Sequence, residues 1–363
     1  SYGEAFPFEH EEAYENQFIY YVRFLEVSQL VLAHLLPDIR AERPDAVMYD
    51  QLCVWGPAIA QLLDVPAISY MTMFVITPWL VMSDPAQLRN RLVSEHYIRR
   101  IRTLTRQISA TYKVRRPSLF EMANNPGQLN IVFTSRYFQP NGNAFNETYT
   151  FVGCSILQRV DAPAFSYEAL DKDRPLIYIS LGTLYNARQD FYQCCFEAFA
   201  GSRYQVVLSV GHKTPISSLG AIPPNFVVKE YVPQLDILQR AALFISHGGM
   251  NSVSEALYYG VPLVVIPQSG DQPWVAKRVV RLGAGKMMKR THVSASRLRH
   301  AAEEVLTHET YAQMSAHVGE TLRQAGGPGR AADAIQDLLH TVVHYASPVP
   351  NSWLETLMYR LSY

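Results

Sequence analysis

Cysteine is scarce in this sequence. Four cysteines in 363 residues are too few to staple a chain of this length with disulfides. Cys194 and Cys195 are adjacent, so they lack the spacing of a zinc site or of a C-x-x-C redox motif. We therefore expect four reduced thiols, as in a cytoplasmic protein.

An excess of charge of one sign and a long apolar run are also missing. The 32 basic and 32 acidic side chains cancel, so no global field favours nucleic acid or an anionic membrane. No uninterrupted apolar run reaches the ~18 residues of a membrane span. The best candidate, residues 256–267, is broken by Gly260 and Pro262, and no signal-like segment follows Ser1. We expect no nucleic-acid partner and no stable membrane insertion.

Apolar residues make up 48% of the chain and recur in patterns that alternate between helix and strand. The length suits two domains at a rough prior of about 150 residues each. In the first half, helices are expected over 12–36, 53–63 and 84–116, and strands over 46–50, 66–70, 130–135 and 148–154. This rhythm predicts an open α/β sheet. Arg99, Arg102 and Arg106 share one helix face, which is either a polyanion site or a solvated charged face.

Residues 160–175 are polar and contain proline, which predicts an interdomain linker. The linker includes Asp171 and Asp173, a D-x-D pair of the kind that can bind a metal holding a sugar nucleotide. The pair precedes a strand instead of following one. We therefore interpret it as exposed linker and expect no metal.

The second half predicts a doubly wound nucleotide-binding domain. Its expected strands are 176–180, 204–210, 226–231, 242–246 and 262–267, and its expected helices are 190–200, 234–240 and 251–259, with further helices starting near 274, 294, 312 and 330.

The most informative segment is Ser246-His-Gly-Gly-Met-Asn-Ser-Val-Ser-Glu255. It predicts a buried strand that ends, two glycines that allow a sharp turn, and a helix that begins. Unpaired N–H groups and the positive dipole end of that helix suit a phosphate, and His247 adds a hydrogen-bond donor. Without a ligand, Ser252 and Glu255 form a capping box and His247 is a structural histidine. The local spacing leaves both interpretations open.

The flanking segments add to this motif. Tyr231-Val-Pro-Gln234 precedes it, and Gly260-Val-Pro-Leu-Val-Val-Ile-Pro267 and Asp271-Gln272 follow it. In this order they resemble the donor-binding signature of the family 1 glycosyltransferases, the UDP-glycosyltransferases, and most of all the bacterial macrolide and flavonoid type. The resemblance extends from roughly residue 45 to residue 339 and is densest from 231 to 272.

The resemblance implies an α/β architecture called GT-B, with two facing Rossmann-like domains. We expect an N-terminal acceptor-side domain over 1–160, a C-terminal UDP-sugar-binding domain over 172–340, and a tail helix over 341–363 that crosses back to the first domain. The cleft between the domains is the expected site. The family's opening strands would precede Ser1, so the first domain is expected to be incomplete at its N-terminus.

The resemblance also implies roles for the matching residues. For the nucleoside, uracil would stack on Tyr231, in the place of an aromatic that is often Trp, and pair with the backbone of Val232, and the ribose would bind Gln234 and Glu255. The diphosphate would be held by His247, Gly249, Asn251 and Ser252, with Gly182 and Thr183 facing its β-phosphate. The hexose would be hydrogen-bonded by Asp271 and Gln272. Without the family, Tyr231 is a core aromatic at a strand end, and Asp271 with Gln272 is a helix cap.

In this family the general base is a histidine after the first strand, and an aspartate at the end of a later strand orients it. Asp50 resembles that aspartate, and its alternative is a strand-end cap. We find no matching histidine, because His10 lies in an acidic segment that leads into a helix. Phe74, Trp79 and Phe138 either line an acceptor pocket or belong to the core.

The implied enzyme is an inverting, metal-independent transferase without a cofactor. It moves a hexose, with glucose favoured, from a UDP-sugar to a hydroxyl of a small hydrophobic acceptor such as a flavonoid or macrolide. One alternative is a non-catalytic UDP-sugar-binding chain that lacks the base histidine. Another is a GT-B epimerase of UDP-amino sugars, against which Asp271 and Gln272 argue.

Overall fold

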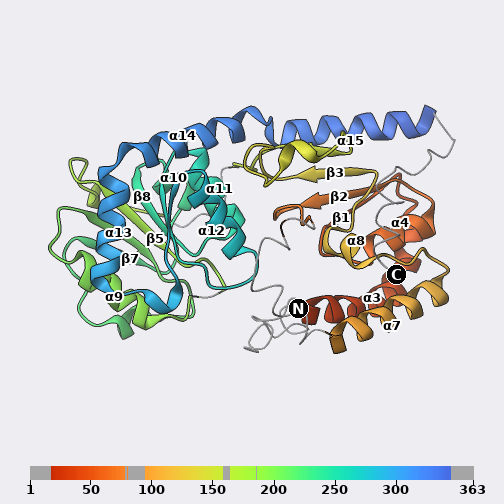
Figure 1. The fold of residues 1–363 in the computed structure, drawn as a ribbon, viewed down its shortest axis with the longest axis horizontal. Helices are drawn as coiled ribbons and strands as arrows, with labels where there is room; N and C mark the ends of the chain where they lie inside the picture. Colours follow the sequence, from red (N-terminus) through yellow and green to blue (C-terminus); the bar gives the residue numbers. More distant parts are fainter. Residues whose placement is uncertain (1–17, 78–79, 81–94, 158–163, 185, 345–363) are drawn as a thin grey trace. The chain divides into compact units, whose positions relative to one another are not determined.

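The computed structural model describes residues 18–77, 80, 95–157, 164–184 and 186–344, and the chain divides by its internal contacts into two units (Figure 1). The first unit comprises Ser1–Val132, Ala144–Thr150 and Pro328–Tyr363, and the second comprises Phe133–Asn143 and Phe151–Gly327. The predicted limits of 1–160 and 172–340 differ from these in three places. Residues 133–143 and the start of the segment 151–327 group with the second unit, and residues 328–340 group with the first.

Two consecutive glycines explain where the chain changes unit near its end. Helix α14 (Glu309–Gln324) stops just before Gly326 and Gly327, whose φ values of +94° and +62° lie in a region that favours glycine. The N–H of Gly327 donates to the carbonyl of Val152 at 2.7 Å, and α15 (Gly327–His344) starts there. The predicted tail crossing after Pro350 lies outside the described residues.

The sheet of the first unit has four strands in the order β1-β2-β3-β4. They are β1 (Val47–Asp50), β2 (Ala67–Met71), β3 (Leu129–Val132) and β4 (Tyr149–Phe151). β1, β2 and β3 pair in parallel, with Asp50 beside Tyr70. Each predicted strand of this half overlaps one of these four.

Among the described residues, four helices contribute the rest of the first unit's core. They are α3 (Phe18–Glu42), α4 (Gly56–Leu63), α7 (Glu95–Tyr112) and α8 (Leu119–Asn124). α3 packs against α7, and α4 contacts β1 and β2 (Figure 1). Within the described chain, α3 is long and apolar enough to cross a membrane by length and composition. Its Phe24, Leu25 and Leu32 lie in the core with α4 and α7, which accounts for its apolar character.

The sheet of the second unit has six parallel strands in the order β10-β9-β8-β5-β6-β7. They are β5 (Leu176–Ser180), β6 (Gln205–Ser209), β7 (Phe226–Lys229), β8 (Ala241–Ser246), β9 (Leu263–Val265) and β10 (Gly285–Met287). Renumbered from β5, this is the 3-2-1-4-5-6 order of Rossmann domains. Its order reverses between β5 and β8, which begin the two halves of the sheet.

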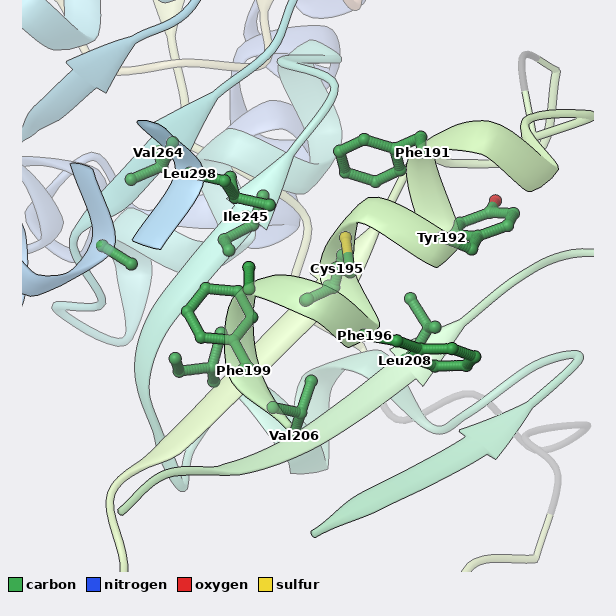
Figure 2. Packing of buried hydrophobic residues seen from close by; sticks show 14 of the residues in the cluster. Phe191, Tyr192, Cys195, Phe196, Phe199, Val206, Leu208, Ile245, Val264 and Leu298 are labelled. Carbon is green, nitrogen blue, oxygen red and sulfur yellow. The ribbon is translucent and has the colours of Figure 1, made fainter. Parts of the chain in front are cut away.

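Helices cover both faces of this second sheet. They are α9 (Gln189–Phe199), α10 (Gln234–Leu238), α11 (Met250–Tyr258), α12 (Gln272–Arg281) and α13 (Ala295–Thr307). On one face, Phe191, Cys195 and Phe199 of α9 pack toward Leu208 and Ile245 of the sheet, and α13 joins them (Figure 2).

The opposite face of the same sheet carries the alternate residues of each strand. There the rings of Tyr178 and Phe244 stack with centroids 4.6 Å apart, and α10 and α11 contact β8. Both units are therefore α/β structures around a parallel sheet, as the sequence predicted.

Candidate functional site

The candidate site begins at the carboxyl ends of β5 and β8. Ser180 and Ser246 end these strands and are paired in register. Each serine hydroxyl accepts an N–H from two residues further on, Gly182 and Gly248, both at 3.2 Å. Because helices leave these adjacent strands toward opposite faces of the sheet, a crevice for a ligand is expected at this switch point.

His247 lies between two glycines of this region. A Cβ built on Gly182 would be 2.6 Å from Cε1 of His247, and a Cβ on Gly249 would be 2.5 Å from its Nε2. Real Cβ atoms essentially never come this close, so a larger residue at either position would displace the imidazole. Gly182 also adopts φ +74°, which favours glycine. Gly182 and Gly249, which the resemblance places at the diphosphate, therefore also leave the space that the imidazole of His247 occupies.

The surroundings of His247 keep it neutral. Its Nδ1 is enclosed without a well-aligned hydrogen-bond partner among the described residues, although the residue as a whole is only half-buried. Burial lowers the pKa of His247 to about 4, and the backbone of Ser180 opposes this only partly. The neutral ring carries one N–H donor, and its charged form would gain from a bound anion.

The amino end of α11 has no side-chain cap. Its N-cap residue is Gly249, which adopts an extended backbone conformation. The capping-box interpretation of Ser252 and Glu255 is therefore wrong, because both residues lie inside the helix. Asn251 is exposed and Ser252 half-buried in its first turn, where N–H groups lack helical partners. This end of α11 suits an anion.

Gln234 and Glu255, both predicted at a ribose, meet in the structure. Nε2 of Gln234 donates to Oε2 of Glu255 at 2.5 Å and lies 3.4 Å from Oγ of Ser252. The hydroxyl of Tyr178 donates to Oε1 of Gln234 at 3.0 Å. Glu255 is only 5% exposed. The amide of Gln234 thus fixes the orientation of this buried carboxylate.

Asn186 holds the turn after β5, and the sequence analysis missed it because no motif marks it. This fully buried side chain donates to the carbonyls of Gly182 and Thr183, at 2.9 and 3.2 Å. In a trans peptide the N–H points opposite the carbonyl, so the N–H groups of Thr183 and Leu184 point away from Asn186. Neither N–H has a hydrogen-bond partner within the described ranges. Such successive donors suit an anion.

Asp271 occupies the N-cap position of α12, yet its carboxylate makes no capping hydrogen bond. Burial raises the pKa of Asp271 to about 6, and a hydrogen bond from its own backbone lowers it less. The side chain forms no ion pair with another described residue. It is therefore a desolvated acceptor that hydroxyl donors from a ligand would stabilise.

Gln272 and Arg188 fix the loop that carries Asp271. Oε1 of the buried Gln272 accepts the N–H groups of Gln268 at 2.7 Å and Ser269 at 3.1 Å. Arg188, from the segment after β5, donates to Oε1 of Gln268 at 3.1 Å and also pairs with Asp190. The oxygen of the Gln272 amide is thus occupied, which leaves its NH2 group for a ligand.

Tyr231 and Val232 follow β7 at the same carboxyl edge of the sheet. Tyr231 is 43% exposed, so the core-aromatic interpretation is wrong. Val232 is buried, and its backbone N–H and C=O make no hydrogen bond in the described part of the chain. An exposed ring beside unpaired backbone groups is suited to a flat base.

Asp50 ends β1 in the first unit, as predicted. Its Oδ1 accepts the N–H of Leu52 at 2.8 Å, which supports the strand-end cap interpretation. Burial raises the pKa of Asp50, while the hydrogen bonds from Leu52 and from the Thr72 side chain lower it. No histidine is bonded to Asp50 among the described residues.

Two of the three candidate acceptor residues, Phe74 and Phe138, are buried. Phe74 is 1% exposed and Phe138 is 0% exposed. Their side chains face no open surface, so the core interpretation holds for both. Trp79 lies outside the described residues. Burial of an aromatic is the ordinary outcome for such residues, and nothing in their spacing separated core from pocket.

The predicted linker acids form a turn. Oδ1 of Asp171 accepts the N–H of Asp173 at 3.0 Å. The side chain of Gln205 bonds the backbone N–H and carbonyl of Asp171 at 2.9 and 2.6 Å. Both acids are exposed, in agreement with the linker interpretation.

Comparisons with known proteins cover most of the chain. Residues 202–338 match the family described as Erythromycin biosynthesis protein CIII-like, C-terminal domain. YojK of Bacillus subtilis (strain 168), named an uncharacterized UDP-glucosyltransferase, is 37% identical over 313 residues, which are 86% of this chain and 77% of YojK. YjiC of the same strain, named an NDP-glycosyltransferase, is 36% identical over 86% of this chain and 77% of YjiC.

A solved structure shows the same fold. CalG4, the calicheamicin glycosyltransferase, matches with a TM-score of 0.77 at 25% identity, over 89% of this chain and 82% of CalG4. The match is too long to be confined to either unit.

Proposed function

This chain belongs to the family 1 glycosyltransferases of GT-B fold, and from that premise we propose that it transfers glucose from UDP-glucose to a hydroxyl of a small hydrophobic acceptor. The transfer inverts the anomeric carbon and uses no metal ion. The main observation behind this proposal is the position of His247, which lies between Gly182 and Gly249 beside the uncapped amino end of α11.

In the proposed complex, the diphosphate binds at the amino end of α11. His247, Gly249, Asn251 and Ser252 hold it there, and the turn of Gly182 and Thr183 faces the β-phosphate. Asn186 supports that role because it turns two N–H groups of this turn outward. Preoriented N–H groups and an uncapped helix end stabilise negative charge without reorganising during the reaction.

The nucleoside and the sugar occupy the two sides of this diphosphate site. Uracil stacks on Tyr231 and pairs with the backbone of Val232, and the ribose hydroxyls bind Glu255 and Gln234. The hexose hydroxyls donate to Asp271 and bind the NH2 group of Gln272. The carboxylate of Asp271 can accept two hydroxyls at once, which suits neighbouring hydroxyl groups of glucose.

The chemical step follows from where charge develops. As the anomeric C–O bond breaks, the leaving UDP gains negative charge, and His247 with the α11 N–H groups stabilises it. The acceptor hydroxyl attacks the opposite face and passes its proton to a general base. Asp50 is the group proposed to orient the base histidine that the family resemblance implies.

The names of the relatives favour this donor. YojK is named a UDP-glucosyltransferase, and YjiC is named more broadly an NDP-glycosyltransferase. The calicheamicin glycosyltransferase CalG4 and the demethyllactenocin mycarosyltransferase of Streptomyces fradiae, the latter 29% identical over 93% of this chain, carry the names of calicheamicin and demethyllactenocin. A natural-product acceptor with a free hydroxyl is therefore the substrate class we propose.

Two measurements test this function. Calorimetry with UDP should give a dissociation constant below millimolar, and UDP-glucose with a simple phenol should give a glucoside whose anomeric configuration is inverted by NMR. Absence of UDP binding would overturn the proposal. UDP binding without transfer to any phenol or macrolide tested would overturn the proposed transferase activity and support a non-catalytic chain that binds UDP-sugars.

Chelation gives a further test of the metal-free mechanism. EDTA should leave the glucoside yield unchanged, because protein N–H groups carry the charge stabilisation. Loss of transfer that Mg²⁺ restores would contradict this mechanism and direct attention to Asp171 and Asp173.

A further inference from the structure

The pairing of β6 with β7 continues past the ends of both strands. The N–H of Gly211 donates to the carbonyl of Glu230 at 2.9 Å. The next residue on each strand, His212 and Tyr231, therefore leaves the carboxyl edge of the sheet side by side. Gly211 fixes this exit, because it adopts φ +69° and a Cβ there would lie 2.0 Å from Nδ2 of Asn186.

The rings of His212 and Tyr231 lie nearly in one plane. Nδ1 of His212 is 2.8 Å from the hydroxyl oxygen of Tyr231, the ring planes differ by 23°, and the centroids are 6.5 Å apart. The hydrogen bond, the phenolic C–O bond of Tyr231 and the two ring radii together account for the whole distance between the centroids. The rings are therefore joined end to end along the O···N line instead of lying one above the other.

This pair makes one flat, accessible surface, which we call the Tyr–His platform. Tyr231 is 43% exposed and His212 is exposed. The hydrogen bond survives a change of protonation, because neutral Nδ1 can accept from the hydroxyl and a protonated Nδ1 can donate to it. The platform is longer than either ring alone and lies at the same sheet edge as the backbone of Val232.

We propose that His212 is a nucleoside-binding residue that extends the stacking surface of Tyr231, so that the donor's uracil rests on both rings of the Tyr–His platform. The inference rests on the proposed UDP-sugar site and adds a residue that no motif marks. A single tyrosine ring offers less area than the two fused rings of tryptophan, and the hydrogen-bonded imidazole supplies the missing part. Stacking strength follows the overlapped aromatic area.

Calorimetric titration with UDP and with uridine tests the platform. His212→Ala should weaken both ligands by the same factor, about 3- to 10-fold, because only part of the stacking surface is lost. Tyr231→Ala should weaken them more, by about 10- to 100-fold. The matched control is His292→Ala, which removes an exposed histidine elsewhere in the same unit and should change neither affinity.

Two further variants isolate the coplanar arrangement. Tyr231→Phe keeps the ring but removes the hydroxyl that aligns His212, so it should lose about as much affinity as His212→Ala. Tyr231→Trp, combined with His212→Ala, should restore affinity because the larger ring system replaces the lost area. If Tyr231→Phe keeps the wild-type affinity and Tyr231→Trp does not restore the affinity lost in His212→Ala, the platform is overturned.

The outcomes separate this inference from the function on which it rests. If the wild-type chain does not bind UDP, the proposed function fails. If it binds UDP and His212→Ala binds UDP and uridine equally well, only the platform fails. A loss confined to UDP and abolished by high salt would mean that His212 contacts phosphate as a cation, which also overturns the platform.

Discussion

The imidazole of His247 occupies the space that a side chain at Gly182 would need, since a Cβ on Gly182 would lie 2.6 Å from Cε1 of the imidazole. The turn after β5 and the motif after β8 are therefore shaped for each other across the switch point of the sheet. A ligand that binds one of these segments contacts a surface whose form depends on the other.

Gly182→Ala should displace His247 and weaken UDP binding by about tenfold or more, the loss of one hydrogen bond to a charged group. The matched control is Gly201→Ala. Gly201 also has positive φ, +63°, but nothing lies within 4 Å of its added Cβ. The control should lose about 1 kcal/mol of unfolding free energy and keep its UDP affinity, as measured by urea unfolding and calorimetry. Equal losses of affinity in both variants would contradict the steric argument.

His247→Ala should weaken UDP binding because it removes a donor to the diphosphate, while uridine binding should stay the same. We expect a loss of about 10- to 100-fold for UDP. Calorimetry with both ligands measures this difference. Unchanged UDP affinity would show that His247 is a structural histidine.

The stability of the second unit should depend on the charge state of His247. The unfolded chain takes up this proton near pH 6.5, whereas the native ring does so only near pH 4. Between these values the unfolded state binds more protons, so the free energy of unfolding falls as the pH falls through this window. The contribution is fully present above pH 6.5 and is on the order of 1–3 kcal/mol.

Urea unfolding at pH 7.5 and pH 4.5 tests this pH dependence. His247→Gln should lose less stability on acidification than the wild type, because its side chain cannot be protonated. His300→Gln, which replaces an exposed histidine on α13, should behave like the wild type. A His247→Gln profile that parallels the wild type would refute the buried neutral imidazole.

Asp271→Asn should reduce the affinity for UDP-glucose, by about tenfold, and leave the affinity for UDP unchanged. Burial raises the pKa of Asp271 to about 6, so the wild type should lose its preference for UDP-glucose over UDP as the pH falls from 8 to 5. The carboxylate is then protonated and accepts fewer hydroxyl donors. Competition binding over this pH range measures the ratio. A ratio that changes equally in Asp271→Asn would exclude Asp271 as its source.

Glu255→Gln should reduce the discrimination between UDP and 2′-deoxy-UDP, because a neutral amide accepts ribose hydroxyls less strongly than a carboxylate. The wild type should prefer UDP by about tenfold. Glu304→Gln, which changes a carboxylate on α13, is the matched control and should keep the full preference. If the wild type binds both nucleotides equally, Glu255 does not contact the 2′-hydroxyl.

Secondary structure was predictable where apolar residues fill a buried parallel strand. β5 has the predicted limits, since all five of its residues are buried between helix layers. β10 was missed because its Gly285, Lys286 and Met287 form no apolar run at the edge of the sheet. α8 was missed although Ser118 and Glu121 form a capping box, a signal that the sequence does contain.

At Ser252 and Glu255 the spacing of a capping box left two interpretations open, and the structure excludes the capping box for a physical reason. Ser252 and Glu255 have capping-box spacing, but Gly249 is the N-cap because the chain turns into α11 three residues earlier. Spacing alone does not reveal where a backbone leaves the extended conformation. That choice depends on the strand before it and on the space around His247.

The sequence by itself determined that two α/β units form and that polar residues follow the carboxyl ends of parallel strands. Alternating apolar segments and glycines carry that information locally. Only the tertiary structure decided that Asn186 pins the turn of Gly182, that α15 groups with the first unit, and that His212 meets Tyr231. The last two relationships join residues far apart along the chain, and Asn186, only four residues from Gly182, is itself held in place by Gly211 and Thr214. Their geometry depends on strand register and close packing, which no local pattern encodes.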